Sequence, residues 1–250
     1  MRKPLMAGNW KMNKTVAEAV TMVKALKDSV ADVTDVEILV CPTYTALYAV
    51  SMAIKDSNIK LGSQNIFWEP KGAFTGEISP GMIKDTGCEY AIIGHSERRQ
   101  YFGETDETVN KRTKAALGSG LVPVVCVGET LAEREANITF KVIETQVREG
   151  LKDLTYDQAS IIVIAYEPVW AIGTGKTATP DQAQEVHAFI RKLYAEMYKD
   201  AAEKIRILYG GSVNPKNVAE LMKQPDIDGG LVGGASLEAD SFTQLVKYSK

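Results

Sequence analysis

Eight short, almost continuously apolar runs recur along the 250-residue chain at fairly regular intervals, and they constrain its fold more than any other feature. The runs span residues 4–10, 36–41, 59–64, 90–94, 121–127, 161–166, 205–209 and 227–232. Continuous apolar character, without alternation, is typical of parallel strands that are covered on both faces. The sequence therefore predicts a largely parallel β-sheet.

Stretches with helical periodicity separate these runs. Residues 15–30 and 179–197 each place their apolar side chains on one stripe of a helix. Patterns typical of helix starts, in which a polar N-cap precedes a glutamate, a glutamine or a proline, occur at Thr15, Ser79, Thr130, Thr179 and Asn214. Strands and helices are therefore expected to alternate along the chain.

This alternation favours one architecture. Eight βα units in 250 residues average about 31 residues each, and no Ser/Gly-rich linker or change of composition divides the chain. Eight such units with right-handed crossovers close into a (β/α)8 barrel. A doubly wound open sheet is the alternative, but it usually carries a glycine-rich turn after its first strand, and residues 8–11 lack one. We expect an α/β fold, a single-domain (β/α)8 barrel over residues 1–250.

Charge and cysteine content argue against several classes of function. The chain has 29 Lys and Arg against 32 Asp and Glu, a net charge of −3, so we expect no nucleic-acid partner. Its three cysteines are odd in number and lack C-x-x-C spacing, which is typical of a reducing compartment. No apolar run approaches the roughly 20 residues that cross a bilayer, and the N-terminus is too quickly polar for a signal peptide. We expect a cytoplasmic protein without membrane contact.

Polar residues and glycines gather where the predicted strands end. In a (β/α)8 barrel all eight carboxyl ends meet at one mouth, whose loops carry the chemistry. The residues at these positions are Asn9, Lys11, Gly94, His95, Ser96, Glu97, Glu167, Gly210, Gly211, Ser212, Gly233 and Gly234. Loops after the last two strands commonly hold a phosphate, and glycines let backbone N–H groups approach its oxygens. Either glycine pair alone would serve a tight turn, but together they predict a phosphate site.

Three of these side chains suit proton transfer or its support. Glu167 precedes apolar residues 168–170, so we expect a general base whose pKa rises on desolvation. His95 precedes a predicted helical turn, whose N-terminus disfavours the imidazolium and keeps the ring a neutral donor. Lys11 would offset negative charge that develops on a substrate, and Glu97 is expected first to pair with Lys11 or an arginine. Each also has a structural interpretation, as an ion-paired carboxylate, a histidine satisfied by the backbone or a surface cation.

Residues 168–177 are predicted to form a mobile lid that closes over the mouth and excludes water. A proline stiffens one end, two glycines loosen the tip, and Trp170 and Ile172 supply apolar cover. A nucleotide-binding P-loop is rejected here, because Trp170 stands where that motif needs a glycine. The lid comprises Pro168, Val169, Trp170, Ala171, Ile172, Gly173, Thr174, Gly175, Lys176 and Thr177.

Two further groups are assigned no chemistry. Cys126 lies inside the fifth apolar run, which predicts a buried core thiol. His187 follows Val186 on the stripe of a predicted helix, and we expect it at the rim of that stripe.

Five stretches of the chain closely resemble the triosephosphate isomerase family. They are residues 8–11, 93–99, 165–175, 209–213 and 232–236, and their order and spacing match the family from near the start to near the end. The resemblance implies a TIM barrel that interconverts dihydroxyacetone phosphate and D-glyceraldehyde 3-phosphate, a step of glycolysis and gluconeogenesis. It also implies that this reaction needs neither cofactor nor metal.

A role for each matching residue is also implied by the resemblance. Glu167 would move the proton between the two carbons, and neutral His95 would polarise the substrate oxygens and transfer protons between them. Asn9 and Lys11 would bind the substrate and stabilise the enediolate. Phosphate would be held by backbone N–H groups of Gly173, Ser212, Gly233 and Gly234. Ser96, Glu97 and Gly211 are expected to support the site.

The resemblance further implies a homodimer. Residues 65–79 form a long predicted loop with Phe67, Trp68 and Phe74 at its apolar tip, which a monomer would bury poorly. In the family this loop docks beside the active site of the partner subunit. The expected contacts are Phe74, Thr75 and Gly76.

From the residues alone, two other functions stay open. An aldolase or synthase acting on a phosphosugar would keep the barrel and the phosphate site, but it needs a Schiff-base lysine or a metal cluster at the strand ends. Lys11 is the only lysine predicted at the mouth outside the lid, and no His, Asp or Glu group has ligand spacing. A non-catalytic phosphate-binding scaffold would keep the fold without turnover.

Overall fold

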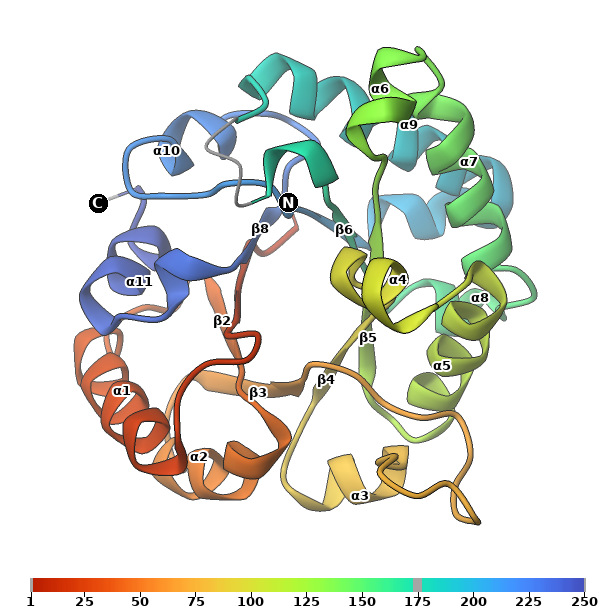
Figure 1. The fold of residues 1–250 in the computed structure, drawn as a ribbon. Helices are drawn as coiled ribbons and strands as arrows, with labels where there is room; N and C mark the ends of the chain where they lie inside the picture. Colours follow the sequence, from red (N-terminus) through yellow and green to blue (C-terminus); the bar gives the residue numbers. More distant parts are fainter. Residues whose placement is uncertain (1, 173–176, 250) are drawn as a thin grey trace.

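Eight parallel strands close into a barrel in the computed structural model, which describes residues 2–172 and 177–249 (Figure 1). Each strand pairs with the next along the chain, and β8 pairs with β1 to complete the ring. The strands are β1 (Leu5–Asn9), β2 (Glu37–Cys41), β3 (Ile59–Ser63), β4 (Tyr90–Ile93), β5 (Val122–Val127), β6 (Val163–Tyr166), β7 (Arg206–Tyr209) and β8 (Gly229–Val232). The predicted (β/α)8 barrel is confirmed, and every strand ends within two residues of its predicted run.

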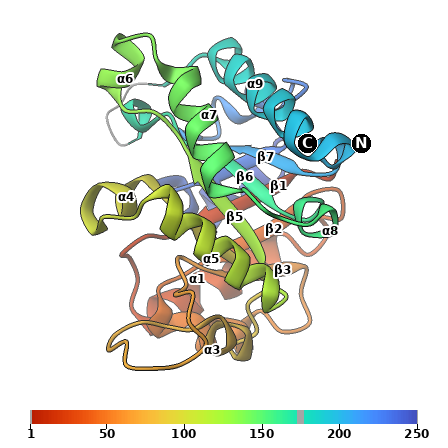
Figure 2. The same cartoon turned by 90° about the vertical axis from the view of Figure 1, so that its right-hand side faces the viewer.

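Helices surround the strands on the outside of the barrel (Figure 1). In the side view of Figure 2, α5 and α7 pack side by side over β5. Short 3-10 turns are η1 (Tyr44–Ala46), η2 (Val169–Ala171), η3 (Lys199–Glu203) and η4 (Gly234–Ser236). The α-helices are α1 (Val16–Ser29), α2 (Leu47–Ala53), α3 (Pro80–Asp85), α4 (Ser96–Phe102), α5 (Asp106–Gly118), α6 (Leu131–Glu135), α7 (Thr139–Gly150), α8 (Tyr156–Ala159), α9 (Pro180–Tyr198), α10 (Val218–Leu221) and α11 (Ala239–Val246).

Most of the predicted helix starts are confirmed. Thr15, Thr130 and Thr179 each form a capping box, and the Ser79 side chain accepts the N–H of Met82. Asn214 behaves differently. Its side chain accepts the N–H of Lys216 and so closes a turn, and α10 begins later, at Val218.

Two apolar layers explain why the strand sequences show no alternation. Side chains that point inward form one cluster inside the barrel, and those that point outward form a second cluster with the helices. The inward cluster consists of Leu5, Ala7, Leu39, Cys41, Tyr90, Ile92, Val124, Cys126, Val163, Ala165, Leu208 and Leu231. Because both faces of each strand are buried, the mouth of the barrel is left as the place for polar side chains. None of the helices in the described ranges is long and apolar enough to cross a bilayer.

Candidate active site

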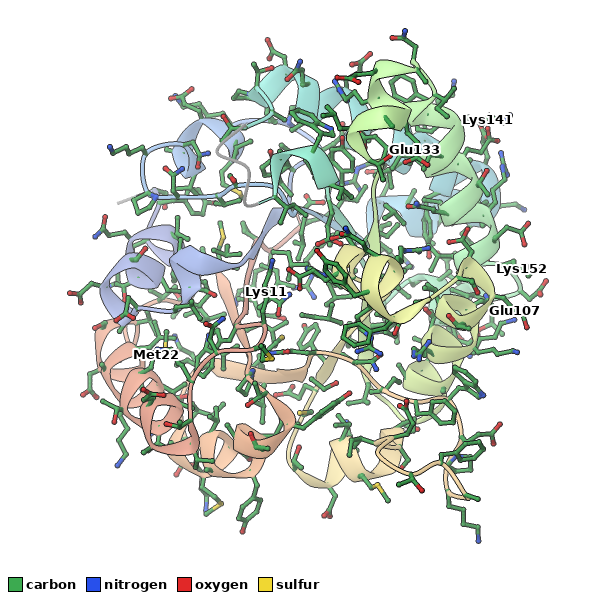
Figure 3. The ribbon with its side chains drawn as sticks, in the orientation of Figure 1. Lys11, Met22, Glu107, Glu133, Lys141 and Lys152 are labelled. Carbon is green, nitrogen blue, oxygen red and sulfur yellow. The ribbon has the colours of Figure 1, made fainter. Side chains whose placement is uncertain are left out.

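A cavity of about 370 Å³ opens at the carboxyl ends of the strands. It brings together nine of the residues predicted at the strand ends, and Lys11 lies near the centre of the view along the barrel (Figure 3). Those nine are Asn9, Lys11, His95, Glu167, Gly210, Gly211, Ser212, Gly233 and Gly234. Among the described residues, no group of three or more His, Cys, Asp or Glu side chains is placed to hold a metal ion.

Glu167 follows β6 directly, and its backbone N–H donates to Val127 O at 2.8 Å. Only 2% of the residue is exposed. One carboxylate oxygen lies 2.8 Å from His95 Nε2, and the other accepts the Ser96 N–H at 2.9 Å. Burial raises the pKa of Glu167, but His95, the Ser96 N–H and Lys11 together outweigh it and leave the pKa below its usual value. The expectation of a raised pKa is wrong for this conformation, because the carboxylate is already paired.

His95 is the N-cap of α4, as the predicted helical turn requires. Its Nδ1 accepts the Glu97 N–H at 3.2 Å, so this nitrogen carries no proton and the ring is a neutral tautomer with its hydrogen on Nε2. Nε2–H then points at Glu167. Burial lowers the pKa of His95, whereas the carboxylates of Glu167 and Glu97 raise it and prevail. The hydrogen bond at Nδ1 therefore indicates a neutral ring in this conformation. The carboxylate of Glu167 favours the imidazolium, which is why the pKa of His95 is raised.

Lys11 has a backbone conformation that few non-glycine residues adopt, with φ at 53°. Its N–H donates to Asn9 Oδ1 at 3.0 Å, and its carbonyl accepts Gln64 Nε2 at 2.8 Å. The Lys11 ammonium lies 2.6 Å from Glu97 Oε1, which confirms the expected pairing. Such a conformation persists only where neighbours hold it, so Gln64 positions the lysine. Gln64 was not predicted, although it directly follows β3 at the same mouth.

Residues of the loops after β7 and β8 also line the cavity. Within the described parts of the chain, the N–H groups of Ser212, Gly233 and Gly234 have no hydrogen-bond acceptor. A Cβ built on Gly234 would meet nothing within 4 Å, so the absent side chain leaves open space. N–H groups without an acceptor, beside open space, are what an anion site needs.

Gly210 and Gly211, which follow β7, have a different structural role. A Cβ on Gly210 would lie 2.8 Å from Cγ of Glu167, and one on Gly211 would lie 2.3 Å from the Tyr209 hydroxyl. Gly210 is therefore needed for close packing beside Glu167, and Gly211 for close packing against Tyr209. Anion contact alone does not explain them.

The start of the predicted lid is anchored by Glu129, a fully buried carboxylate. Trp170 Nε1 donates to Glu129 Oε1 at 2.9 Å, and the Val169 N–H donates to its carbonyl at 3.1 Å. On the other side, Ser212 Oγ donates to Ala171 O at 2.9 Å. Glu129 was not predicted, because the lid residue Trp170 that it holds lies 41 residues away in the sequence.

Further predicted lid residues follow Ala171 in the sequence. Ile172 lines the cavity, as expected for an apolar cover, and Thr177 is exposed. The predicted lid residues Gly173, Thr174, Gly175 and Lys176 lie outside the described residues, and so does the predicted phosphate contact of Gly173.

The prediction for Cys126 is confirmed and the prediction for His187 is wrong. Cys126 is fully buried, as predicted. The expectation for His187 is wrong, since it is 0% exposed and its Nδ1 lies 3.1 Å from Asp226 O. The buried stripe of α9 is wider than predicted and includes His187 and Arg191.

Residues 65–79 extend from the barrel as a loop whose aromatic side chains pack on one another. The ring centroid of Phe67 lies 4.1 Å from that of Trp68 and 4.7 Å from that of Phe74. At the tip, Phe74, Thr75 and Gly76 are exposed. The aromatic cluster therefore shapes the loop without covering its tip.

Comparisons with known proteins agree with this arrangement. The family model described as triosephosphate isomerase matches residues 4–249. The chain is 76% identical to the triosephosphate isomerase of Endomicrobium trichonymphae over the full length of both, and 61% identical to that of Geobacter metallireducens over 99% of both. The crystal structure of triosephosphate isomerase from Bartonella henselae superposes with a TM-score of 0.91 at 40% identity, covering 99% of each chain. The chain belongs to the triosephosphate isomerase family.

Proposed function

We propose that this glycolytic isomerase interconverts dihydroxyacetone phosphate and D-glyceraldehyde 3-phosphate with Glu167 as the base that moves the proton. One observation carries the proposal: a carboxylate and a neutral imidazole meet in a cavity that is also lined by Ser212, Gly233 and Gly234, whose N–H groups have no acceptor among the described residues. A triose phosphate has a carbon acid at one end and a dianion at the other. The paired carboxylate and imidazole suit the carbon acid, and the N–H groups without an acceptor suit the dianion.

The proposed reaction needs no co-reactant. Glu167 takes a proton from the hydroxymethyl carbon of the ketone, and the electron pair moves to the carbonyl oxygen to form an enediolate. The Nε2–H of His95 protonates that oxygen, and the ring then takes the proton of the neighbouring hydroxyl. Glu167 returns its proton to the second carbon, which completes the aldehyde. Asn9 and Lys11 stabilise the negative charge that develops on the oxygens.

The proposed phosphate contacts are the N–H groups of Ser212, Gly233 and Gly234, together with Gly173 of the predicted lid. Closure of residues 168–177 would exclude water and keep the enediolate from eliminating phosphate. The Ser212 hydroxyl donates to Ala171 O, so it links the loop after β7 to the start of this segment. Phosphate binding and lid position are therefore expected to be coupled.

Solvent-deuterium exchange tests the reaction. The protein is incubated with dihydroxyacetone phosphate in D2O, and label at the hydroxymethyl carbon is followed by NMR. We expect label in the substrate and formation of glyceraldehyde 3-phosphate. A phosphosugar aldolase would give cleavage or condensation products, and a scaffold would bind inorganic phosphate and give no label. Either result would contradict the isomerase assignment.

A homodimer is also proposed, in the cytoplasm, where the three buried free cysteines would stay reduced. Large apolar side chains are exposed around the mouth and the 65–79 loop, and Met12, at 94% exposure, adjoins the candidate site. A cavity of about 210 Å³ beside it shares Asn9, Lys11 and His95 with that site and would receive the loop of a second copy. Exposed apolar surface of this kind marks interfaces.

The oligomeric state is tested by sedimentation of the 27.3 kDa chain. We expect a dimer, and we expect Thr75→Glu to give monomers because it places a charge at the loop tip. Lys60→Glu, at the opposite end of the barrel, is the matched control and is expected to stay dimeric. A monomeric wild-type chain with full activity would contradict the proposal.

A further inference from the structure

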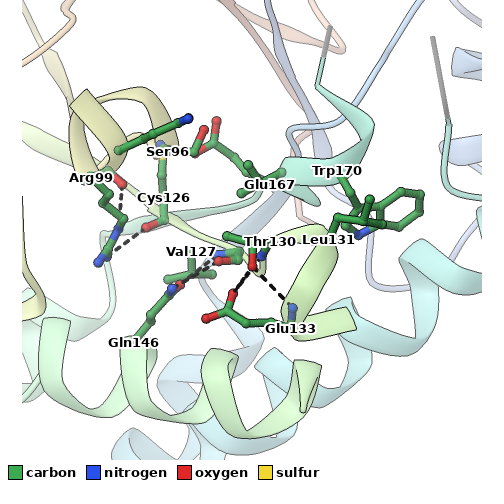
Figure 4. A pocket seen from close by; sticks show the side chains of 14 residues that line it. Ser96, Arg99, Cys126, Val127, Thr130, Leu131, Glu133, Gln146, Glu167 and Trp170 are labelled. Atoms are coloured by element: carbon green, nitrogen blue, oxygen red, sulfur yellow. Dashed lines mark hydrogen bonds between the residues drawn. The ribbon is translucent and has the colours of Figure 1, made fainter. Parts of the chain in front are cut away.

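Gly128 lies where the β5–β6 ladder ends. The last pair of the ladder is Val127 with Tyr166, and the Glu167 N–H still donates to Val127 O at 2.8 Å. The two backbone groups of Gly128 are bonded elsewhere, to one side chain of α7. Gly128 N–H donates to Gln146 Oε1 at 2.7 Å, and Gly128 O accepts Gln146 Nε2 at 3.1 Å (Figure 4).

The Gly128 backbone in turn touches the backbone of Glu167. A Cβ on Gly128 would lie 1.7 Å from the carbonyl oxygen of Glu167 and 2.7 Å from its carbonyl carbon. No side chain can stand between them, so a shift of Gly128 is transmitted to Glu167 with little loss. The Gln146 amide thus fixes the peptide against which the carboxylate-bearing residue rests.

We propose that Gln146 is a positioning residue for the catalytic base, which it serves by holding Gly128 through both atoms of its primary amide. The inference rests on the proposed role of Glu167. Proton transfer from carbon depends steeply on distance, and a displacement of about 1 Å can cost roughly 100-fold in rate. The amide has both the acceptor for the Gly128 N–H and the donor for the Gly128 C=O, so no apolar side chain replaces it.

A cavity of about 500 Å³ adjoins this amide and makes the proposal testable. It is lined by Gln146, Glu167 and Trp170, which Figure 4 labels. Gly128 and Gln100, the latter from α4, line it as well. Removing the Gln146 amide would leave the Gly128 N–H and C=O facing this space. Water would satisfy them without restoring their position, so the fold would persist while the base is held less firmly.

The test is Gln146→Ala with chemical rescue. The missing atoms correspond to acetamide, which is small enough to enter the adjoining cavity. We expect kcat to fall roughly 10- to 100-fold, with KM and the inhibition constant of inorganic phosphate unchanged, because the phosphate contacts lie on other loops. Acetamide should restore part of kcat in the variant and leave the wild type unaffected. N,N-dimethylacetamide, which has no N–H to donate, should not.

Gln100→Ala is the matched control. It truncates the same residue type in the same cavity, and its side chain has no hydrogen bond within the described parts of the chain. We expect wild-type kcat for this variant, with or without acetamide. A Gln146→Ala variant with wild-type kcat, or one that only melts earlier and shows no rescue, would overturn the inference and leave the isomerase assignment standing. A wild-type protein without deuterium exchange would overturn both.

Discussion

Nε2 of His95 lies 2.8 Å from Oε1 of Glu167, while the Ser96 N–H occupies the other carboxylate oxygen. The proposed base and the proposed acid are therefore paired with each other in this conformation. The Nδ1 atom of His95 is occupied by the Glu97 N–H, so only Nε2 can serve a substrate. A bound triose phosphate must replace Glu167 at this nitrogen, which couples substrate entry to release of the carboxylate.

Glu167→Gln should abolish most of the turnover and leave phosphate binding intact. An amide cannot accept a proton from carbon at neutral pH, and its NH2 group would face one of the two donors, the Nε2–H of His95 or the Ser96 N–H. We expect kcat to fall roughly 10²- to 10⁴-fold, while inorganic phosphate inhibits as in the wild type. Steady-state kinetics with phosphate titration measure both quantities. A rate near that of the wild type would remove Glu167 as the base.

Gly234→Asp should weaken phosphate binding. The substitution places a carboxylate in the open space beside three N–H groups that have no acceptor among the described residues. We expect a higher KM for the triose phosphate and weaker inhibition by inorganic phosphate, with a larger effect at low salt. Gly234→Ala is the control for size alone, since a Cβ there meets nothing within 4 Å. Unchanged phosphate inhibition in the aspartate variant would place the anion elsewhere.

Gln64→Glu should impair catalysis through Lys11. Nε2 of Gln64 donates to the carbonyls of Lys11 and Cys41, at 2.8 and 2.9 Å, and a carboxylate would present an acceptor to both. The strained backbone of Lys11 would then lose one of its supports. We expect kcat/KM to fall roughly tenfold, on the scale of one or two lost hydrogen bonds. A Gln64→Glu variant with wild-type kcat/KM would show that Asn9 alone holds the lysine.

The fold was predictable because strand and helix signals agree along the whole chain. Continuous apolar runs arise from burial on both faces, and N-caps such as Thr15 and Thr179 act locally, so both are readable from neighbouring residues. The mouth was predictable for a topological reason, since all parallel strands end there. That residues 1–250 form one domain stays a prediction, as do the individual roles of the site residues.

The supports of the site were not predictable, because they depend on contacts between distant residues. Gln64, Glu129 and Gln146 act on backbone groups or side chains of other loops, and nothing in their local sequence distinguishes them from surface residues. The error over His187 has the same origin. A helical stripe shows which residues are candidates for burial, but the width of the buried face depends on what packs against it.

His187 gives the last prediction, a pH dependence of stability. Burial lowers the pKa of this imidazole from 6.5 to about 4. Its ring packs edge-on to Tyr166, and it is enclosed near Asp226, Asp228 and Arg191. Below pH 6.5 the unfolded chain binds a proton that the folded chain does not, so stability is full above 6.5 and falls as the pH drops toward 4.

When the pH falls from 7.5 to 5.0, this histidine should therefore lower the free energy of unfolding by about 2 kcal/mol. The decrease is about 1.4 kcal/mol per pH unit below 6.5. His187→Asn keeps a donor for the Asp226 carbonyl but cannot titrate, so its loss over the same interval should be smaller by that amount. Urea denaturation at fixed protein concentration measures both proteins. Equal losses in the two would mean that the folded chain protonates His187 as readily as the unfolded one.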